Sequence, residues 1–352
     1  MTGPETAGNW RLDWPVSAGQ RLAVAHLKTT PEDFRVTESL WPDAETGVCD
    51  DKGSGEHLCV WLEKTGDNTE YVARELAGIA GCKPFEVGFC GLKDRHAVTR
   101  QWFSLYCPGR ESADAAVREA ISARWTIKGW RRHARKLQRG EHLSNGFHLL
   151  LRQVAGDRER LNVALATLAA TGAPNYFGPQ RFGLGGGNLE QAVRLDVASL
   201  NRKRGRRYGG GRSASKNVLY FSAARSWLFN EVLARRVVAG NWSINLPGEP
   251  GPEAGPTGPL WGDGGTTATG EQERLERSVV AESPEFERLF QATRMGPERR
   301  PLVARADALE WRWPDDDSLE LRFSLPPGQY ATTILSDIFE LKDMSLSRHN
   351  KD

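Results

Sequence analysis

A short polar segment in the first third of the chain places a carboxylate between two cations. Residues 91–101 read GLKDRHAVTRQ, with Asp94 flanked by Lys93 and Arg95. Neighbouring cations favour the ionised form of a carboxyl group and lower its pKa. An ionised carboxylate at the mouth of a sheet can act as a nucleophile or as a base. Taken alone, the pattern also fits an aspartate that only closes a turn through local hydrogen bonds.

Hydrophobic periodicity predicts the elements that position this segment. Asp94 is expected in a polar turn between two strands. A helix precedes the turn, with Asp67 or Asn68 as its N-cap and Gly81 at its end. Runs of β-forming residues predict strands at 57–62, 85–89, 101–107 and 147–151.

The rest of the chain changes character twice. Residues 155–240 have mainly helical periodicity, interrupted by glycine-rich loops. The run 247–265 holds five prolines and seven glycines, which excludes a helix or a central strand and predicts an ordered loop, a flexible loop or a passive linker. Alternation returns at 319–325, and 331–341 has the pattern of a closing helix. This order predicts an α+β protein whose sheet is interrupted by a helical insertion.

Basic residues gather in two stretches, although the 352-residue chain carries a formal net charge of only +2. Residues 120–140 and 197–230 contain no acid, and together they hold fifteen of the 47 lysines and arginines. Binding to a phosphate backbone strengthens with the number of such contacts. Aromatic side chains in these stretches could stack on unpaired bases. They are Trp125, Trp130, Tyr208, Tyr220 and Phe221. The pattern favours a nucleic-acid partner over a basic face that is merely solvated.

The sequence does not support other kinds of site. The glycine runs at 183–188 and 209–216 match neither a dinucleotide fingerprint nor a phosphate loop. No apolar stretch is long enough to span a membrane, and the start lacks a signal-peptide pattern. Five cysteines without a Cys-x-x-Cys pair, and scattered histidines, predict neither a disulfide framework nor a metal site. We therefore expect a cytoplasmic, metal-free protein with reduced thiols.

Five segments, in order between about residues 20 and 340, resemble the TruD family of tRNA pseudouridine synthases. Residues 91–101 are similar to the family signature G-x-K-D-x-x-A-x-T-x-Q, in which the aspartate is catalytic. The other four are KTTPEDFRVTE from Lys28, HARKLQRG followed by Asn145-Gly-Phe147, NYFGPQRFG from Asn175, and FSLPPGQYATT from Phe323.

The resemblance implies a fold and a reaction. Both chain ends, 1–152 and 304–352, would form a pseudouridine synthase core with a mixed or antiparallel sheet. A TRUD domain would be inserted at 153–303, giving a V-shaped molecule. The reaction would be the isomerisation of uridine to pseudouridine at position 13 of tRNA, without a cofactor. The partner would be tRNA, and no obligate protein partner is evident.

The resemblance also implies roles for individual residues. Asp94 would be the catalytic carboxylate, Phe147 would stack on the flipped base, and Asn145 would bind the target nucleotide or hold Asp94. Lys28 would pair with Glu38 or with a backbone phosphate, and Gln101 would orient the loop that carries Asp94. The predicted substrate-binding set is Lys28, Phe34, Glu38, Lys93, Gln101, Asn145 and Phe147. The predicted RNA-binding set is Arg132, Arg135, Lys136, Arg181, Arg202, Lys203, Arg204, Arg206 and Arg207. No residue is assigned to a metal.

Two other functions remain open at this level. A non-catalytic RNA-binding or RNA-chaperone protein could use the same basic surface, although the intact GLKD segment argues against it. A glycoside hydrolase would need a second carboxylate at a defined separation from the first. The sequence shows no convincing partner of this kind for Asp94.

Overall fold

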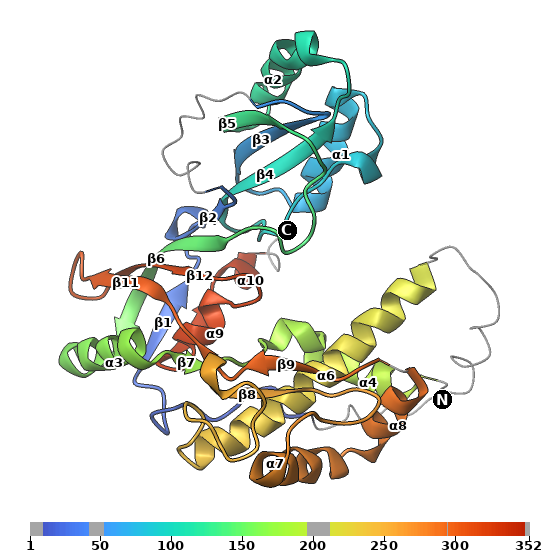
Figure 1. Ribbon diagram of the computed structural model, residues 1–352. Coiled ribbons are helices and arrows are strands. Elements are labelled where there is room, and N and C mark those ends of the chain that lie inside the picture. Colours follow the sequence, from blue (N-terminus) through green and yellow to red (C-terminus); the bar gives the residue numbers. More distant parts are fainter. Residues whose placement is uncertain (1–9, 42–52, 196–211, 294, 349–352) are drawn as a thin grey trace, which may run out of the picture. The chain divides into compact units, whose positions relative to one another are not determined.

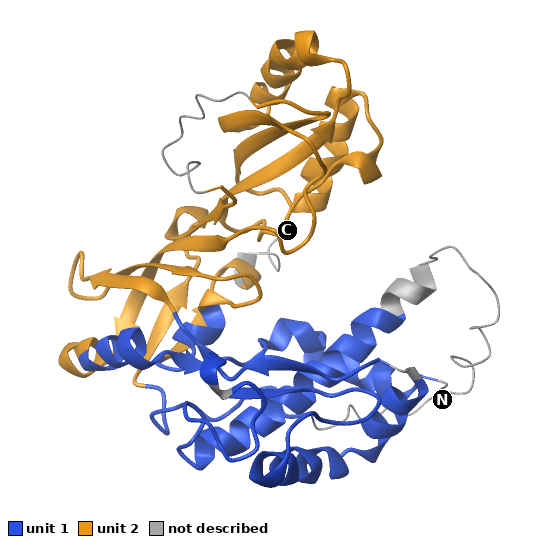
Figure 2. Ribbon diagram, in the orientation of Figure 1, with its two compact units in different colours: residues 1–21, 163–305, 332–338 blue, residues 22–162, 306–331, 339–352 orange. Residues whose placement is uncertain are grey.

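The computed structural model describes residues 10–41, 53–195, 212–293 and 295–348. The chain forms two compact units (Figure 2). The sheet unit comprises 22–162, 306–331 and 339–352, and the helical unit comprises 1–21, 163–305 and 332–338. Each unit is therefore assembled from segments that are distant in the sequence.

In the described residues, the sheet unit is built on one nine-stranded sheet (Figure 1). Most neighbours in the order β11-β12-β6-β2-β4-β3-β5 are antiparallel, but β2 and β4 run parallel. Strand β1 pairs antiparallel with β6 and parallel with β13. The strands are β1 Ala23–Leu27, β2 Phe34–Ser39, β3 His57–Lys64, β4 Val98–Tyr106, β5 Thr126–His133, β6 Ser144–Ala155, β11 Asp307–Arg312, β12 Leu319–Leu325 and β13 Phe339–Asp343. The predicted α+β fold with a mixed sheet is confirmed.

Helices α1 (Thr69–Ala80) and α2 (Asp114–Ser122) cover one face of the β3–β4–β5 half of this sheet. The Asn68 side chain accepts a hydrogen bond from the Tyr71 amide, and Gly81 ends α1 in the left-handed conformation with φ 66°. The apolar side of α1 packs against alternate residues of the strands. The buried residues of this core include Leu58, Val60, Val72, Leu76 and Phe103.

The helical unit surrounds the 27-residue helix α6 (Arg212–Val238). Its core contains Leu228, Phe229 and Val232 from that helix. The remaining α-helices in the described residues are α3 Arg158–Thr171, α4 Gly187–Val193, α7 Gly270–Ala281, α8 Pro284–Thr293, α9 Ala331–Leu335 and α10 Ser345–Arg348. Two short sheets complete the helical unit: β7 Ala173–Pro174 with β10 Val303–Ala304, and β8 Thr257–Leu260 with β9 Glu298–Pro301.

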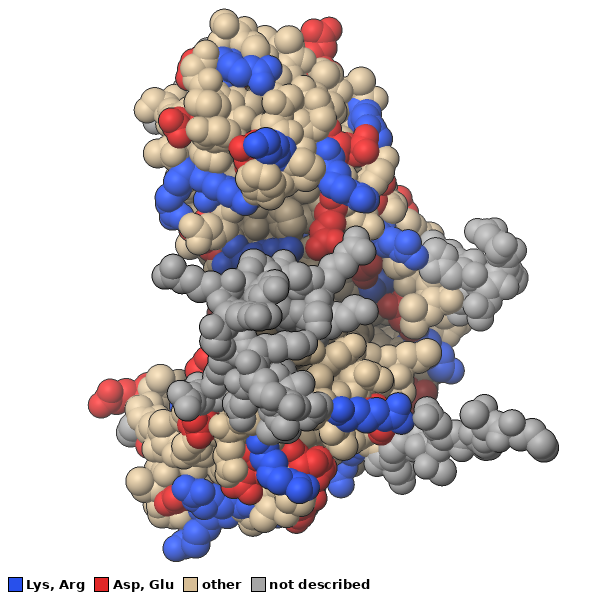
Figure 3. Space-filling model, turned by 90° about the vertical axis from the view of Figure 1, so that its right-hand side faces the viewer, with Lys and Arg blue, Asp and Glu red and all other residues tan. Residues whose placement is uncertain are grey.

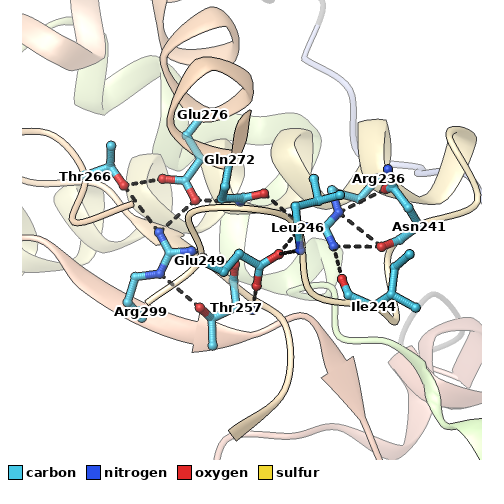
Figure 4. Close-up of polar contacts among 10 residues, drawn as sticks. All are labelled: Arg236, Asn241, Ile244, Leu246, Glu249, Thr257, Thr266, Gln272, Glu276 and Arg299. Carbon is cyan, nitrogen blue, oxygen red and sulfur yellow. Dashed lines mark hydrogen bonds and ion pairs between the residues drawn. The ribbon is translucent and has the colours of Figure 1, made fainter. Parts of the chain in front are cut away.

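The proline- and glycine-rich run 247–265 is an ordered part of the helical unit, because a buried polar network ties it to the helices (Figure 4). Glu249 accepts hydrogen bonds from the Leu246 and Thr257 amides and pairs with Arg236 of α6 at 2.5 Å. Both side chains of that pair are at most 1% exposed. The interpretation as a flexible loop or passive linker is therefore wrong. The run is ordered, and its residues Thr257–Leu260 form β8, which pairs with β9 alone and is not a central strand.

A second pair continues the network across α7. Glu276 is paired with Arg299 of β9 at 2.7 Å, and its side chain is fully buried. Gln272 joins the two pairs, since it accepts from Arg236 at 2.8 Å and donates to Glu276 at 2.7 Å. Thr266 completes the cluster through a short hydrogen bond to Glu276. Residues that no local pattern connects are thus fixed to each other inside the unit.

Two predicted elements differ from the structure. The helix predicted at 331–341 stops at Leu335, and after a turn at 336–338 the chain forms β13 beside β1. Helical spacing within 331–341 was real, but pairing with a strand more than 300 residues away decides the conformation. Residues 85–89 form a 3-10 turn and a single bridge at Gly88 instead of a full strand, since Pro84 starts the turn.

No helix in the described ranges is long and apolar enough to cross a membrane. Cys59, Cys82, Cys90 and Cys107 are free thiols. Among the described side chains, no group of three His, Cys, Asp or Glu residues is arranged to hold a metal ion.

Candidate active site

The loop that carries Asp94 lies in the sheet unit and is held from two sides. Gln101 of β4 donates to the Gly91 carbonyl at 2.5 Å and accepts from the Thr69 hydroxyl at 3.0 Å. Thr69, the first residue of α1, also accepts from the Lys93 amide at 2.9 Å. The loop conformation thus depends on the start of a helix and on a buried strand residue.

Asp94 itself is about one-third exposed and is bonded through both carboxylate oxygens. Oδ2 lies 2.5 Å from Lys28 Nζ, and Oδ1 accepts from the His96 amide at 2.9 Å. Burial raises the pKa of Asp94, but the hydrogen bond and charge of Lys28 and the His96 amide outweigh it, so the pKa lies below its ordinary value. The carboxylate is therefore ionised at neutral pH and still reachable from solvent.

Lys28 is a buried cation between two carboxylates. Its ammonium lies 2.5 Å from Asp94, 3.0 Å from Asp343 and 5.0 Å from the centre of the Phe34 ring. Burial lowers the pKa of Lys28, but the two carboxylates raise it above its ordinary value. Its φ of 57° is left-handed, which costs an L-residue roughly 1–2 kcal/mol. The local contacts hold Lys28 in this conformation.

The predicted pairing of Lys28 with Glu38 is wrong. Glu38 pairs instead with Lys93 at 2.6 Å, and its side chain is fully buried. Its second oxygen accepts from the Trp102 amide at 3.2 Å. The polar groups of Glu38, Lys93 and Gln101 are therefore occupied by the protein. We assign Glu38 and Lys93 to support of the loop instead of contact with substrate, and the contacts of Gln101 agree with its predicted role in orienting the loop.

Three phenylalanines form an aromatic cluster beside the Lys28–Asp94 pair. Phe34 meets Phe147 edge to face at 6.2 Å between ring centres, and Phe147 stacks on Phe323 at 5.3 Å. The register of β2, β6 and β12 produces this arrangement, since Phe147 lies opposite Val36 on one side and Phe323 on the other. Phe147 remains partly exposed. A planar base could stack on such a surface.

Asn145 lies two residues before Phe147 on β6 and pairs across the sheet with Glu38. Its amide lies 3.0 Å from Nε2 of His142. Burial, together with the charge of Lys93, lowers the pKa of His142 to about 4. The imidazole is therefore neutral at neutral pH and can accept a hydrogen bond from Asn145, which fixes the direction of the amide.

A cavity of about 560 Å³ opens along the same sheet. Phe147 is among its lining residues, whereas Asp94 and Lys28 are not. Its charged lining residues are Arg35, Glu63, Arg100, Asp307, Glu310 and Arg322, and His148 also lines it.

The predicted RNA-binding residues have different environments. Arg132 is buried, with its guanidinium bonded to Asp114 at 2.5 Å, and it also donates to the Cys107 carbonyl. It cannot reach a phosphate in this conformation, so we withdraw it from the set. Arg135 is 62% exposed and pairs with Glu141. Among the predicted stacking aromatics, Trp125 and Phe221 are buried.

The remaining basic candidates are distributed over both units. Lys136 of the sheet unit donates to the Phe85 carbonyl at 2.5 Å. Arg181 of the helical unit hydrogen-bonds Ser222 and Ser226 of α6. Basic and acidic side chains are interspersed on the face drawn in Figure 3. Five further candidates lie outside the described residues: Arg202, Lys203, Arg204, Arg206 and Arg207.

Sequence reasoning missed three residues of this site. Thr69 and His142 are polar residues whose role depends on contacts across the sheet, and single-sequence patterns do not show such contacts. Asp343 lies two residues beyond the helix predicted over 331–341, and that prediction gave no sign of a strand that pairs with the other end of the chain.

Comparison with known proteins places this arrangement in a family. The model of the family described as tRNA pseudouridine synthase D (TruD) matches residues 19–189 and 251–338. The tRNA pseudouridine synthase D of Marinobacter nauticus is 64% identical over 348 residues, covering 97% of this chain and 98% of that protein. The Cellvibrio japonicus protein of the same name is 40% identical and covers 96% of each chain. This chain therefore belongs to the TruD family of tRNA pseudouridine synthases.

A solved structure supports the fold. The crystal structure of a protein described as tRNA pseudouridine synthase D (TruD) from Methanosarcina mazei superposes with a TM-score of 0.66. It covers 94% of this chain and 96% of its own, at 21% sequence identity. This superposition supports the fold, whereas the family model and the two relatives confirm the resemblance seen in the five sequence segments.

Proposed function

We propose that this protein isomerises uridine to pseudouridine in tRNA and that Asp94 is its catalytic carboxylate. The relatives named tRNA pseudouridine synthase D match nearly the whole chain. The observation that carries the assignment of Asp94 is its environment. It is ionised and partly exposed, on a loop held by hydrogen bonds of Gln101 and Thr69, beside an aromatic cluster in which Phe147 is partly exposed.

The reaction defines what the site must do. The bond between N1 of uracil and C1′ of the ribose breaks, the base turns, and C5 bonds to C1′. C5 then loses its proton and N1 takes one up, so the product is an isomer of the substrate. Because no net oxidation occurs, we propose that the chain works without a cofactor. A base inside a helical stack cannot turn, so the nucleotide must be flipped out. Asp94 would attack C1′ or the pyrimidine ring, or take a sugar proton on a glycal route.

Neighbouring residues would orient the flipped nucleotide. Phe147, with Phe34 beside it, would stack on the uracil and hold its plane. Asn145, oriented by His142, would hydrogen-bond the nucleotide. Lys28 would keep Asp94 ionised, and this role replaces the predicted contact with Glu38 or a phosphate.

The finer parts of the function remain proposals of the same account. We propose position 13 of tRNA as the target and the cytoplasm as the location. We propose that 153–303 is the inserted TRUD domain, most of which lies in the helical unit together with the first 21 residues. Arg135, Lys136, Arg181 and the five basic residues between 202 and 207 would contact phosphates, which position the RNA without reading its sequence.

Pseudouridine formation by the purified protein tests the proposal. Unmodified tRNA transcripts should gain pseudouridine at position 13, and a matched transcript with cytidine at that position should gain none. Binding of both transcripts without any isomerisation would favour the non-catalytic RNA-binding alternative.

A further inference from the structure

We propose that Asp343 is a positioning residue that shares the Lys28 ammonium with Asp94 and keeps this cation neutralised while Asp94 reacts. The inference rests on the proposed function. It assigns a role to the last strand of the sheet, which the site described above does not require for direct contact with the nucleotide.

The pairing of the two chain ends puts Asp343 in this place. Strand β13 runs parallel to β1, with Leu27 opposite Asp343, and the Met344 amide donates to the Leu27 carbonyl at 2.9 Å. Lys28 follows Leu27 directly and turns back with its left-handed φ. Its ammonium then lies 3.0 Å from Oδ2 of Asp343.

The two oxygens of Asp343 have separate tasks. Oδ1 accepts from the amide of Ser345 at 3.0 Å and from its hydroxyl at 2.5 Å, which closes the turn into α10. Oδ2 faces Lys28. The turn therefore fixes the direction in which the second oxygen presents its charge, and Asp343 does not depend on Lys28 alone for its orientation.

A reacting carboxylate would otherwise leave a buried charge behind. When Asp94 bonds to carbon or takes a proton, it loses its negative charge. The Lys28 side chain is only 7% exposed, and an unpaired buried ammonium is costly. Asp343 supplies a charge that takes no part in the reaction. Because Asp343 stays paired with the ammonium throughout, the loss of charge on Asp94 costs less free energy than it would if Asp94 were the only carboxylate beside Lys28.

Kinetics of isosteric variants test the proposal in the full-length protein with tRNA. Asp343→Asn should lower the single-turnover rate at saturating tRNA roughly ten- to a hundredfold, the worth of a hydrogen bond to a charged group. The tRNA concentration at half-saturation should stay the same, because Asp343 makes no contact with RNA. Asp343→Glu should recover part of the rate. Ser345→Ala removes the hydroxyl bond to Oδ1 but keeps the amide bond and the carboxylate charge, so its loss of rate should be clearly smaller than that of Asp343→Asn.

A double-mutant cycle separates charge sharing from a structural role. In a Lys28→Met background there is no ammonium to share, so adding Asp343→Asn should cause no further loss. The proposal would be overturned if Asp343→Asn caused an equal loss in both backgrounds or had the wild-type rate. It would also be overturned if Asp343→Asn failed to fold while Ser345→Ala folded. If the wild-type protein itself forms no pseudouridine, the proposed function fails, and that result is distinct from any of these.

Discussion

Glu249 should be among the most sensitive positions for stability, although it lies in a proline- and glycine-rich segment. Its side chain is 1% exposed and pairs with Arg236, which is fully buried. Replacement by glutamine keeps the shape but removes the charge and one acceptor. Breaking a buried ion pair from one side costs about 3–5 kcal/mol, because the remaining charge is left uncompensated.

The contacts of Arg236 narrow this range of the expected loss in unfolding free energy. Arg236 would keep acceptors on Gln272 at 2.8 Å and on the Asn241 carbonyl at 2.7 Å, so its hydrogen bonds are largely preserved. We therefore expect a loss near the lower end, about 3 kcal/mol, since mainly the charge compensation is lost. For a unit of this size, that loss lowers the melting temperature by roughly 6–12 °C.

A matched control lies one residue away on the same helix. Arg235 pairs with Glu282 at the surface, with side chains 37% and 65% exposed. Glu282→Gln should cost at most about 1 kcal/mol, as for exposed pairs. Calorimetric melts of Glu249→Gln, Glu282→Gln and the wild type provide the comparison. A melting temperature for Glu249→Gln equal to that of Glu282→Gln would refute the reasoning.

Two further predictions concern the pKa of Asp94 and the binding of tRNA. Lys28→Met should shift the acid limb of the single-turnover pH profile to higher pH, because Lys28 holds the pKa of Asp94 low and burial alone would raise it. An acid limb at the wild-type position would show that Lys28 does not set the pKa of the group that limits the rate. Exchange of five basic residues for serine should weaken tRNA binding. The slope of log affinity against log salt concentration should become flatter by roughly 0.7–0.9 per lost phosphate contact, while the single-turnover rate at saturating tRNA should change little. An unchanged slope would point to residues 120–140 as the phosphate-binding segment instead. The five residues are Arg202, Lys203, Arg204, Arg206 and Arg207.

Local signals in the sequence predicted the parts of the fold that local physics determines. Asn68 and Gly81 bound the first helix because capping and left-handed backbone depend on neighbouring residues. The alternation of 319–325 places its residues on β12 as predicted. The GLKD segment lies in a loop just before a strand, although the strand expected ahead of it is a turn.

Contacts between distant residues could not be predicted in the same way. The pairing of β1 with β13 replaced a helix and brought Asp343 to Lys28. Arg132 lies in a stretch without acids, yet Asp114 from the preceding helix neutralises it. Charge patterns show where cations occur in the chain, but burial and partners depend on tertiary packing.

The most direct test of the central claim is tritium release from 5-labelled uridine in tRNA by Asp94→Asn, beside a titration of tRNA binding. The substitution preserves size and removes the charge that would act on the nucleotide. We predict that release is abolished while binding stays close to that of the wild type, since phosphate contacts elsewhere supply most of the affinity. Near-normal release by Asp94→Asn would contradict the assignment of Asp94 as the catalytic carboxylate.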